Sequence, residues 1–394
     1  MVAVKSTANP WLYRGELCLK KEGPFLLASN SGSLLVLMIM VGLSACMSGS
    51  TNTPSLPSTV TGSSLPTATP VTPTWTPGRP TKTTPRDVRP TEIVITAVPP
   101  ATVGSLDPSG DWIALGVDLD GGFSFGPDGN AEIVLLDVEL ARQNPNQAYF
   151  INLTNHPAND FTPTWSPDGQ RLAFRSSRNG NDDIFVMNWD GSGLTDLTNN
   201  PSDEISPAWS PDGLKIAFAR YEGGGNNEIY VMNMDGANAV RLTDSPSLDE
   251  YPSWSPDGKQ IAFMSHRDAN WEIYVMNADG SDQRRLTNNL EDDSAPAWSP
   301  DGSWIAYSAN HTVGGEVNSG IYLVKPDGSD LTALTDTPGG DAFPGWAPDG
   351  QQLAFMSYCD GRHGMYIMNV DGSDPTFLIR LPEGWLPPAW RPRP

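Results

Sequence analysis

The sequence is poor in cysteine and in basic residues. Its three cysteines, Cys18, Cys46 and Cys359, are scattered over 394 residues, which excludes a disulfide framework and a thiolate zinc site. Lys and Arg total 24 against 46 Asp and Glu, so the formal net charge is -22. Because phosphate backbones and anionic headgroups repel such a chain, we expect no nucleic-acid partner and no direct membrane binding. A cationic or neutral partner fits this charge.

The motifs of nucleophilic, metal-dependent and phosphate-binding enzymes are also missing. The chain has no G-x-S-x-G, H-E-x-x-H, C-x-x-C or G-x-x-x-x-G-K pattern. These absences favour a binding protein without a cofactor over an enzyme.

The N-terminal region has the pattern of an export signal. Basic residues precede an apolar run over 33–42, which has the length of a signal-peptide core and is short for a transmembrane helix. The run ends in Leu43-Ser44-Ala45-Cys46, which resembles the lipobox of bacterial lipoproteins, where the leader is cut before a cysteine that carries diacylglycerol. The resemblance implies a signal peptide over 1–45 and lipidation of Cys46, and an uncleaved anchor helix is the alternative. Both place the remaining chain outside the cytoplasm.

Residues 46–101 are dominated by Ser, Thr and Pro and cannot bury a core. Pro-rich chain prefers extended polyproline II at about 3.1 Å per residue, so roughly 55 residues reach roughly 170 Å. We therefore expect a linker that holds a domain away from the membrane. A strand-like run over 92–98 interrupts it, either as an outer edge strand of that domain or as part of the linker.

One pentapeptide recurs at near-constant intervals through the rest of the chain. Trp-Ser-Pro-Asp-Gly occurs four times, Trp-Ala-Pro-Asp-Gly once, and one more tryptophan follows, the repeated positions being Trp165, Trp209, Trp254, Trp298, Trp346 and Trp390. Spacings of 44 to 48 residues are typical of propellers and solenoids. Each interval holds short alternating apolar runs without helical periodicity, which indicates strands.

The interval around Trp254 shows the predicted unit. Strands are expected over 251–255, 260–265, 272–277 and 284–287, with tight turns at the two Asp-Gly pairs between them. Four antiparallel strands in about 44 residues make one propeller blade. The pentapeptide is then the end of the innermost strand and its exit turn, with the tryptophan packed between neighbouring blades.

The repeats resemble those of the TolB family, also called WD40-like or PD40 repeats, with the pattern P-x-W-S-P-D-G, I-A-F, E-I-Y-V-M-N, D-G, R-L-T. This chain carries the pattern at 252–258, 261–263, 272–277, 279–280 and 285–287. The resemblance implies a β-propeller over 102–394 and envelope scaffolding through protein partners. The lipobox and the linker depart from that family, whose members are usually soluble in the periplasm.

The two ends of the repeat region predict the number of blades. A degenerate first unit over 108–154 lacks an innermost strand, whereas 387–392 is such a strand with nothing after it. We therefore predict a six-bladed, monomeric propeller that the C-terminal strand closes by pairing into the first blade.

The two faces of the predicted propeller differ in their side chains. The pentapeptide and Asp-Gly turns share one face, called the turn face here, and are expected to be only tight turns. The loops between blades and between second and third strands share the opposite loop face. A carboxylate stands five residues before each tryptophan of the five pentapeptides: Asp160, Glu204, Asp249, Asp293 and Asp341. These either ring the channel mouth and bind cationic groups of a partner, or pair with Arg178, Arg220 and Arg267 and with backbone amides.

Three histidines and two phenylalanines supply the alternatives. His266, His311 and His363 lie in loops of consecutive blades and are a candidate Zn, Mn or Fe site, which would suit a metal-dependent carbohydrate-active enzyme such as a polysaccharide lyase. An insertion in the first blade carries Phe123 and Phe125, which we expect to form a contact loop. Together with Trp271 they suggest extracellular glycan binding as a third alternative. The preferred interpretation is a non-enzymatic, lipid-anchored envelope binding protein without a cofactor.

Overall fold

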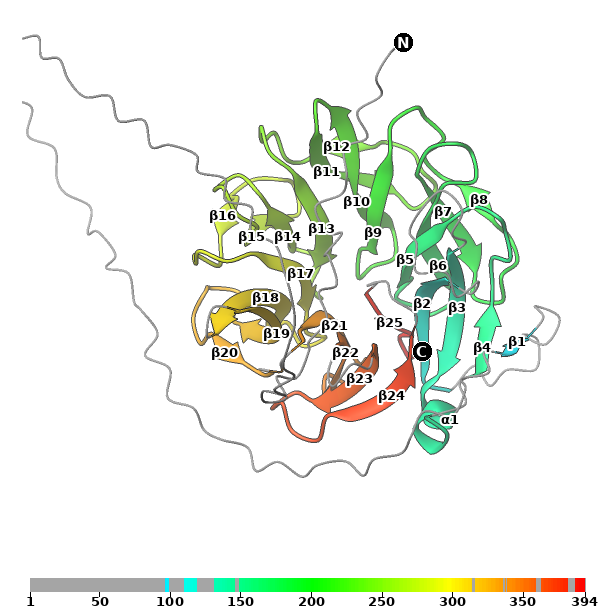
Figure 1. Cartoon of the computed structure of the whole chain (residues 1–394). Coiled ribbons are helices and arrows are strands. Elements are labelled where there is room, and N and C mark those ends of the chain that lie inside the picture. The colour runs from blue at the N-terminus through cyan, green and yellow to red at the C-terminus, as the bar shows by residue number, and fades with distance from the viewer. Residues whose placement is uncertain are drawn as a thin grey trace, which may run out of the picture. The chain divides into compact units, whose positions relative to one another are not determined.

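The computed structural model describes residues 96–98, 110–118, 131–145, 149–313, 316–335, 337, 339–358, 363–381 and 387–393. Its strands form six sheets arranged around a central axis (Figure 1). This arrangement confirms the predicted six-bladed β-propeller of antiparallel blades.

Blades 2 to 6 each consist of four consecutive antiparallel strands, numbered from the axis outward. Blade 2 holds β5 (Asp160–Trp165), β6 (Arg171–Ser176), β7 (Asp183–Asn188) and β8 (Thr195–Asp196). Blade 3 holds β9 (Glu204–Trp209), β10 (Lys215–Gly223), β11 (Asn226–Asn233) and β12 (Val240–Arg241). Blade 4 holds β13 (Asp249–Trp254), β14 (Gln260–Ser265), β15 (Glu272–Asn277) and β16 (Arg284–Arg285). Blade 5 holds β17 (Asp293–Trp298), β18 (Ile305–Val313), β19 (Glu316–Val324) and β20 (Thr332–Ala333). Blade 6 holds β21 (Asp341–Trp346), β22 (Gln352–Ser357), β23 (Gly364–Asn369) and β24 (Thr376–Arg380).

Blade 1 combines the two ends of the described chain. Its sheet has the order β1-β4-β3-β2-β25, formed by β1 (Thr96–Val98), β4 (Tyr149–Asn152), β3 (Ala131–Asp137), β2 (Trp112–Asp118) and β25 (Ala389–Trp390). The short helix α1 (Val138–Gln143) connects β3 to β4, and the Asp137 side chain caps its first turn. β1 pairs in parallel with β4, so the strand-like run near the end of the linker region supplies an outer edge strand.

The C-terminal segment closes the ring as predicted. Trp390 pairs with Ile113 of β2, and the next residue, Arg391, is 5% exposed. Its Nε donates to the Gly169 carbonyl oxygen at 2.9 Å, and its guanidinium lies 5.3 Å and 4.5 Å from the ring centroids of Trp165 and Trp189. Burial lowers the pKa of this guanidinium. The C-terminal segment therefore closes the ring in two ways. Its backbone pairs with β2 of blade 1, and the Arg391 guanidinium contacts two tryptophan rings of blade 2.

The innermost strands share a bulge that their sequence explains. Three residues before the tryptophan the backbone is left-handed, and the φ values at Thr162, Ser206, Tyr251, Ala295 and Phe343 lie between 48° and 57°. The next residue is always proline, which has no N–H to donate to the ladder. In blade 4 the pairing register with β14 shifts between Glu250 and Ser253.

The apolar core lies between the blades. Buried side chains form six clusters, and each cluster joins two neighbouring blades. The repeated tryptophans take part, for example Trp209 between blades 2 and 3 and Trp254 between blades 3 and 4. This confirms the predicted position of the tryptophans. In the described part of the chain, no helix combines the length and the apolar character that crossing a membrane requires.

Candidate functional site

The five carboxylates that precede the tryptophans are all buried. Each begins an innermost strand on the loop face, and all five side chains have 0% exposure: Asp160, Glu204, Asp249, Asp293 and Asp341. They therefore form no exposed surface at the channel mouth. The sequence spacing gave their place along the strand correctly, but their depth depends on the neighbouring blades, which cover them.

Three of the five carboxylates pair with the arginines named above. Arg178 Nη2 lies 3.0 Å from Asp160 Oδ2, Arg220 Nε 2.8 Å from Glu204 Oε1, and Arg267 Nη2 2.7 Å from Asp249 Oδ2. Each pair forms within one blade. A buried carboxylate needs such a partner, because an unpaired buried charge is strongly destabilising. Of the two roles expected for these carboxylates, pairing with arginine is therefore the one found at these three positions.

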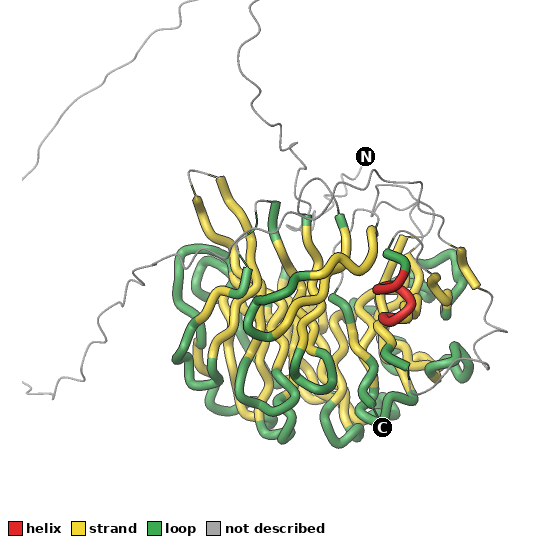
Figure 2. The backbone as a smooth tube through the Cα atoms, turned by 90° about the horizontal axis from the view of Figure 1, so that it is seen from below, coloured by secondary structure: helices red, strands yellow, loops and turns green. Residues whose placement is uncertain are grey.

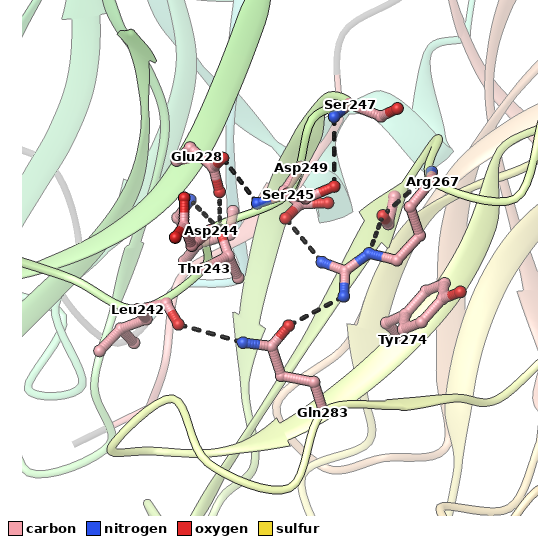
Figure 3. Close-up of polar contacts among 12 residues, drawn as sticks. Glu228, Leu242, Thr243, Asp244, Ser245, Ser247, Asp249, Arg267, Tyr274 and Gln283 are labelled. Atoms are coloured by element: carbon pink, nitrogen blue, oxygen red, sulfur yellow. Dashed lines mark hydrogen bonds and ion pairs between the residues drawn. The ribbon is translucent and has the colours of Figure 1, made fainter.

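A second set of buried carboxylates links the third strand of a blade to the loop that follows its fourth strand (Figure 3). Thr243 Oγ1 accepts from the Ile229 amide at 2.9 Å and donates to Glu228 Oε2 at 2.5 Å. Ser245 N donates to Glu228 Oε1 at 2.9 Å. Glu272 and Thr287 repeat the contact at 2.6 Å. The sequence analysis missed this role, although the glutamate of the E-I-Y-V-M-N pattern marks the position.

Blade 5 lacks the arginine that pairs with the buried carboxylate in blades 2, 3 and 4. Thirteen residues after the pentapeptide tryptophan, Arg178 and Arg267 stand in blades 2 and 4, whereas His311 stands in blade 5. Asp293 receives a hydrogen bond from Asn289 Nδ2 at 2.7 Å. Burial raises the pKa of Asp293 to about 8, compared with about 6 for Asp249 beside its arginine. Asp293 is therefore largely protonated at neutral pH.

The three candidate metal-binding histidines lie apart in blades 4, 5 and 6. Each packs against an aromatic ring of its own blade, with centroids 5.3 Å apart for His266 and Trp271, 6.4 Å for His311 and Tyr322, and 3.7 Å for His363 and Tyr358. Across the residues that the structure describes, no group of three or more His, Cys, Asp or Glu side chains is arranged to hold a metal.

The aromatic surface proposed for glycans is not present at Trp271, which is 4% exposed and offers no face for stacking. Phe123, Phe125 and Cys46 lie outside the described residues. The contact loop and the lipidation of Cys46 stay predictions.

A cavity of about 590 Å³ runs along the axis and is lined by the innermost strands of all six blades. The proline two residues before each tryptophan contributes to its wall, at Pro163, Pro207, Pro252, Pro296, Pro344 and Pro388. Small residues follow each proline, at Thr164, Ala208, Ser253, Ala297, Gly345 and Ala389. The sequence analysis missed this cavity, whose signal is the proline of each P-x-W triplet.

The two ends of the cavity differ. Toward the loop face, the lining residue Tyr251 and the neighbouring Phe343 lie with ring centroids 6.2 Å apart. Toward the turn face the lining residues belong to the exit turns, among them Pro300, Pro348 and Asp349. Asp349 and Arg393 are the charged residues of the described lining. A wall of proline and small side chains, which also carries hydroxyl groups such as those of Thr164 and Ser253 and is fixed in the sheets, suits an extended segment.

The closed ring of repeated blades defines a β-propeller with a cavity along its axis. Three overlapping segments, 124–242, 195–312 and 287–393, match the TolB beta propeller domain, PD40. They cover more than half of the chain, which belongs to this family.

Individual relatives agree with this assignment. A stretch of 38 residues is 55% identical to the Tol-Pal system protein TolB of Syntrophus aciditrophicus and covers 10% of this chain and 8% of that protein. The crystal structure of TolB from Acinetobacter baumannii is similar with a TM-score of 0.58, at 22% identity over 73% of this chain and 67% of that one. A structure assigned as TolB from Agrobacterium tumefaciens gives 0.53, also at 22% identity, over 73% of this chain and 99% of that one. At this identity the structures support the fold alone.

Proposed function

We propose that the chain is a non-enzymatic envelope protein that binds an extended segment of a partner protein in the axial cavity. The observation that carries the proposal is the cavity itself, which receives proline and small side chains from every blade. Because these residues belong to paired strands closed into a ring, the wall is formed before a partner arrives, which lowers the entropy cost of binding. Membership of the TolB propeller family supports protein binding at the envelope.

We also propose that residues 1–45 are a cleaved leader, that lipidated Cys46 anchors the chain, and that 46–101 link it to the propeller over 102–394. The described chain joins the propeller through β1, at the outer edge of blade 1. The innermost strands form the cavity, so attachment at this edge leaves the cavity free. Cys46→Ala is expected to move the protein from the membrane to the soluble fraction and to abolish fatty-acid labelling. Unchanged labelling would rule out this anchor.

Filling the cavity tests the binding function. The full chain carrying Ala208→Phe with Ala297→Phe places two rings on its wall, where both alanines lie. The matched control is Ala237→Phe with Ala239→Phe, at two exposed alanines outside the lining. Affinity enrichment from envelope membranes is expected to recover the same protein with the native chain and the control, and to lose it with the filled cavity. Recovery by all three chains, with melting temperatures showing that each is folded, would refute binding in the cavity.

A further inference from the structure

The turn face carries a set of exposed aspartates that the sequence assigned only to turns. Each Asp-Gly turn presents one, and all ten are exposed: Asp168, Asp190, Asp212, Asp235, Asp257, Asp279, Asp301, Asp327, Asp349 and Asp371. Figure 2 shows these closely spaced turns along the lower edge of the molecule. Five of the ten belong to the exit turns of the innermost strands, and Asp349 itself lines the cavity. These five, Asp168, Asp212, Asp257, Asp301 and Asp349, are called the rim aspartates here.

The rim aspartates are fixed in place by their own turns. Asp257 Oδ1 accepts from the Ser255 hydroxyl at 2.7 Å and from the Lys259 amide at 3.0 Å. The equivalent serine contact is 2.6 Å at Asp212 and at Asp301. The serine hydrogen bond, with the amide, lowers the pKa of Asp257 to about 2. The serine hydrogen bond also lowers the pKa of Asp168, Asp212 and Asp301, so these four carboxylates stay ionised over the physiological range.

Cations on this face compensate part of the aspartate charge, since Arg171 and Lys215 act electrostatically on Asp168 and Asp212. Lys259 Nζ lies 3.1 Å from Asp257 Oδ2, and Lys325 pairs with Asp330, which is itself exposed. Arg393, at the cavity mouth, makes a bidentate contact with Asp111 at 2.8 Å and 2.9 Å. No cation acts electrostatically on Asp190, Asp279, Asp301 or Asp371, so these four described aspartates leave the face negatively charged.

The loop face offers no comparable charge from its ring of carboxylates, since all five are buried and three are matched by arginines. Toward that face Tyr251 and Phe343 lie with ring centroids 6.2 Å apart. Exposed acids such as Asp203 and Glu222 lie on the loop face too, so the turn face is distinguished by the rim aspartates around the cavity, of which Asp349 lines it.

We propose that the turn face binds a cationic segment of a partner protein, in which an apolar extended stretch enters the cavity and flanking Lys or Arg side chains lie over the rim aspartates. This inference rests on the proposed function and names the chemistry of its partner. The charge would speed association and reject acidic partners, while the cavity would supply the apolar contact.

Two variants of equal charge change separate this surface from net charge. In the turn-face variant the five rim aspartates become asparagine, whose Oδ1 still accepts the turn hydrogen bonds. In the loop-face control five described acids outside the buried ring lose the same charge: Asp203→Asn, Glu222→Gln, Asp244→Asn, Asp268→Asn and Glu291→Gln. Melting temperatures establish that both full-length variants fold.

The probe is a fluorescein-labelled peptide with a run of lysines followed by alternating valine and alanine, compared with a peptide that has glutamates in place of the lysines. Fluorescence anisotropy is expected to show binding of the lysine peptide to the native chain and to the loop-face control. Binding to the turn-face variant is expected to be about tenfold weaker and less sensitive to salt. The glutamate peptide is expected not to bind.

Other outcomes decide against one or both proposals. Equal affinity for the native chain and the turn-face variant, or tighter binding of the glutamate peptide, would overturn the cationic partner. If the Ala208→Phe and Ala297→Phe chain loses the lysine peptide while the turn-face variant keeps it, the cavity function stands and this inference fails. If cavity filling has no effect while the turn-face variant loses binding, the charge assignment stands without the cavity. Failure of both peptides to bind the native chain would count against both.

Discussion

The propeller holds two rings of carboxylates that differ only in the end of the innermost strand at which they stand. Asp249 begins β13 and is fully buried, and burial raises its pKa to about 6. Asp257 follows the same strand, is exposed, and has a pKa lowered to about 2 by its serine and its turn amide. Eight residues of sequence thus separate a group that costs desolvation from one that water and hydrogen bonds stabilise.

This contrast teaches that the end of the strand at which a carboxylate stands determines the role of its charge in this propeller. At the loop end, groups of the preceding blade such as Thr243 and Glu228 lie beside Asp249, so its charge must be matched inside the protein, as Arg267 does. At the turn end the carboxylate is exposed, as at Asp257, and its charge can act on a partner.

The largest effect on both carboxylate sets is expected from opening the propeller ring that holds them in place. Deleting residues 385–394 removes β25 and Arg391, exposing the edge of β2 and the faces of Trp165 and Trp189. We expect aggregation and loss of a cooperative melting transition. Arg393→Ala is the control, since this exposed pair with Asp111 is worth about 1 kcal/mol or less. A deletion variant that melts like the native chain would contradict closure by the C-terminus.

Removing one buried partner has the next largest expected effect. Arg267→Met leaves Asp249 buried without its cation and is expected to lower the free energy of unfolding by about 3 kcal/mol at neutral pH, as measured by urea denaturation. Adding Asp249→Asn removes the unpaired charge and is expected to restore much of the loss. If the double variant is no more stable than Arg267→Met, the unpaired charge is not the cause.

Asp293 is expected to make stability fall as pH rises. Its pKa is about 8 when folded against 3.8 as the ordinary value, so the folded state keeps a proton that the unfolded chain releases between these values. Unfolding then releases a proton, and the free energy of unfolding falls with rising pH by up to about 2 kcal/mol between pH values of about 6 and about 8. Asp293→Asn, which keeps an oxygen for Asn289, should flatten this slope. An unchanged slope would show that Asp293 does not change its protonation state over this pH range.

The smallest effect on stability is expected at an exposed rim aspartate. Asp257→Asn keeps the oxygen that accepts from Ser255 and Lys259 and should change the free energy of unfolding by about 0.5 kcal/mol or less, with the same pH slope as the native chain. Thermal unfolding at two pH values checks both statements. A loss as large as that of Arg267→Met would erase the distinction between the two rings.

The repeat made the fold predictable because each blade is specified locally. In the unit around Trp254 the predicted strands 260–265 and 272–277 agree with β14 and β15. The first strand was placed at 251–255 but runs from Asp249 to Trp254, since the left-handed residue Tyr251 lies within it as a bulge. A bulge of this kind depends on pairing with the next strand, which alternation alone does not reveal.

The candidate sites were harder to predict because they depend on contacts between blades. The spacing found Asp249 and Arg267 and allowed their pairing, but the burial of Asp249 requires its neighbours in space. The histidines stand at unequal distances from their tryptophans, and they do not come together in the fold. The cavity arises only where six equivalent P-x-W triplets face one axis, so a single repeat does not predict it.

Closure by β25 also has a consequence for the order in which the molecule is completed. Arg393 contacts Asp111, 282 residues earlier in the chain, so the first blade is completed only once residues 389–393 have been synthesised. Until then the inner edge of β2 has no partner, and a chain that ends before these residues carries an open sheet edge. Proteases and chaperones that recognise exposed edges are therefore expected to act on such truncated chains.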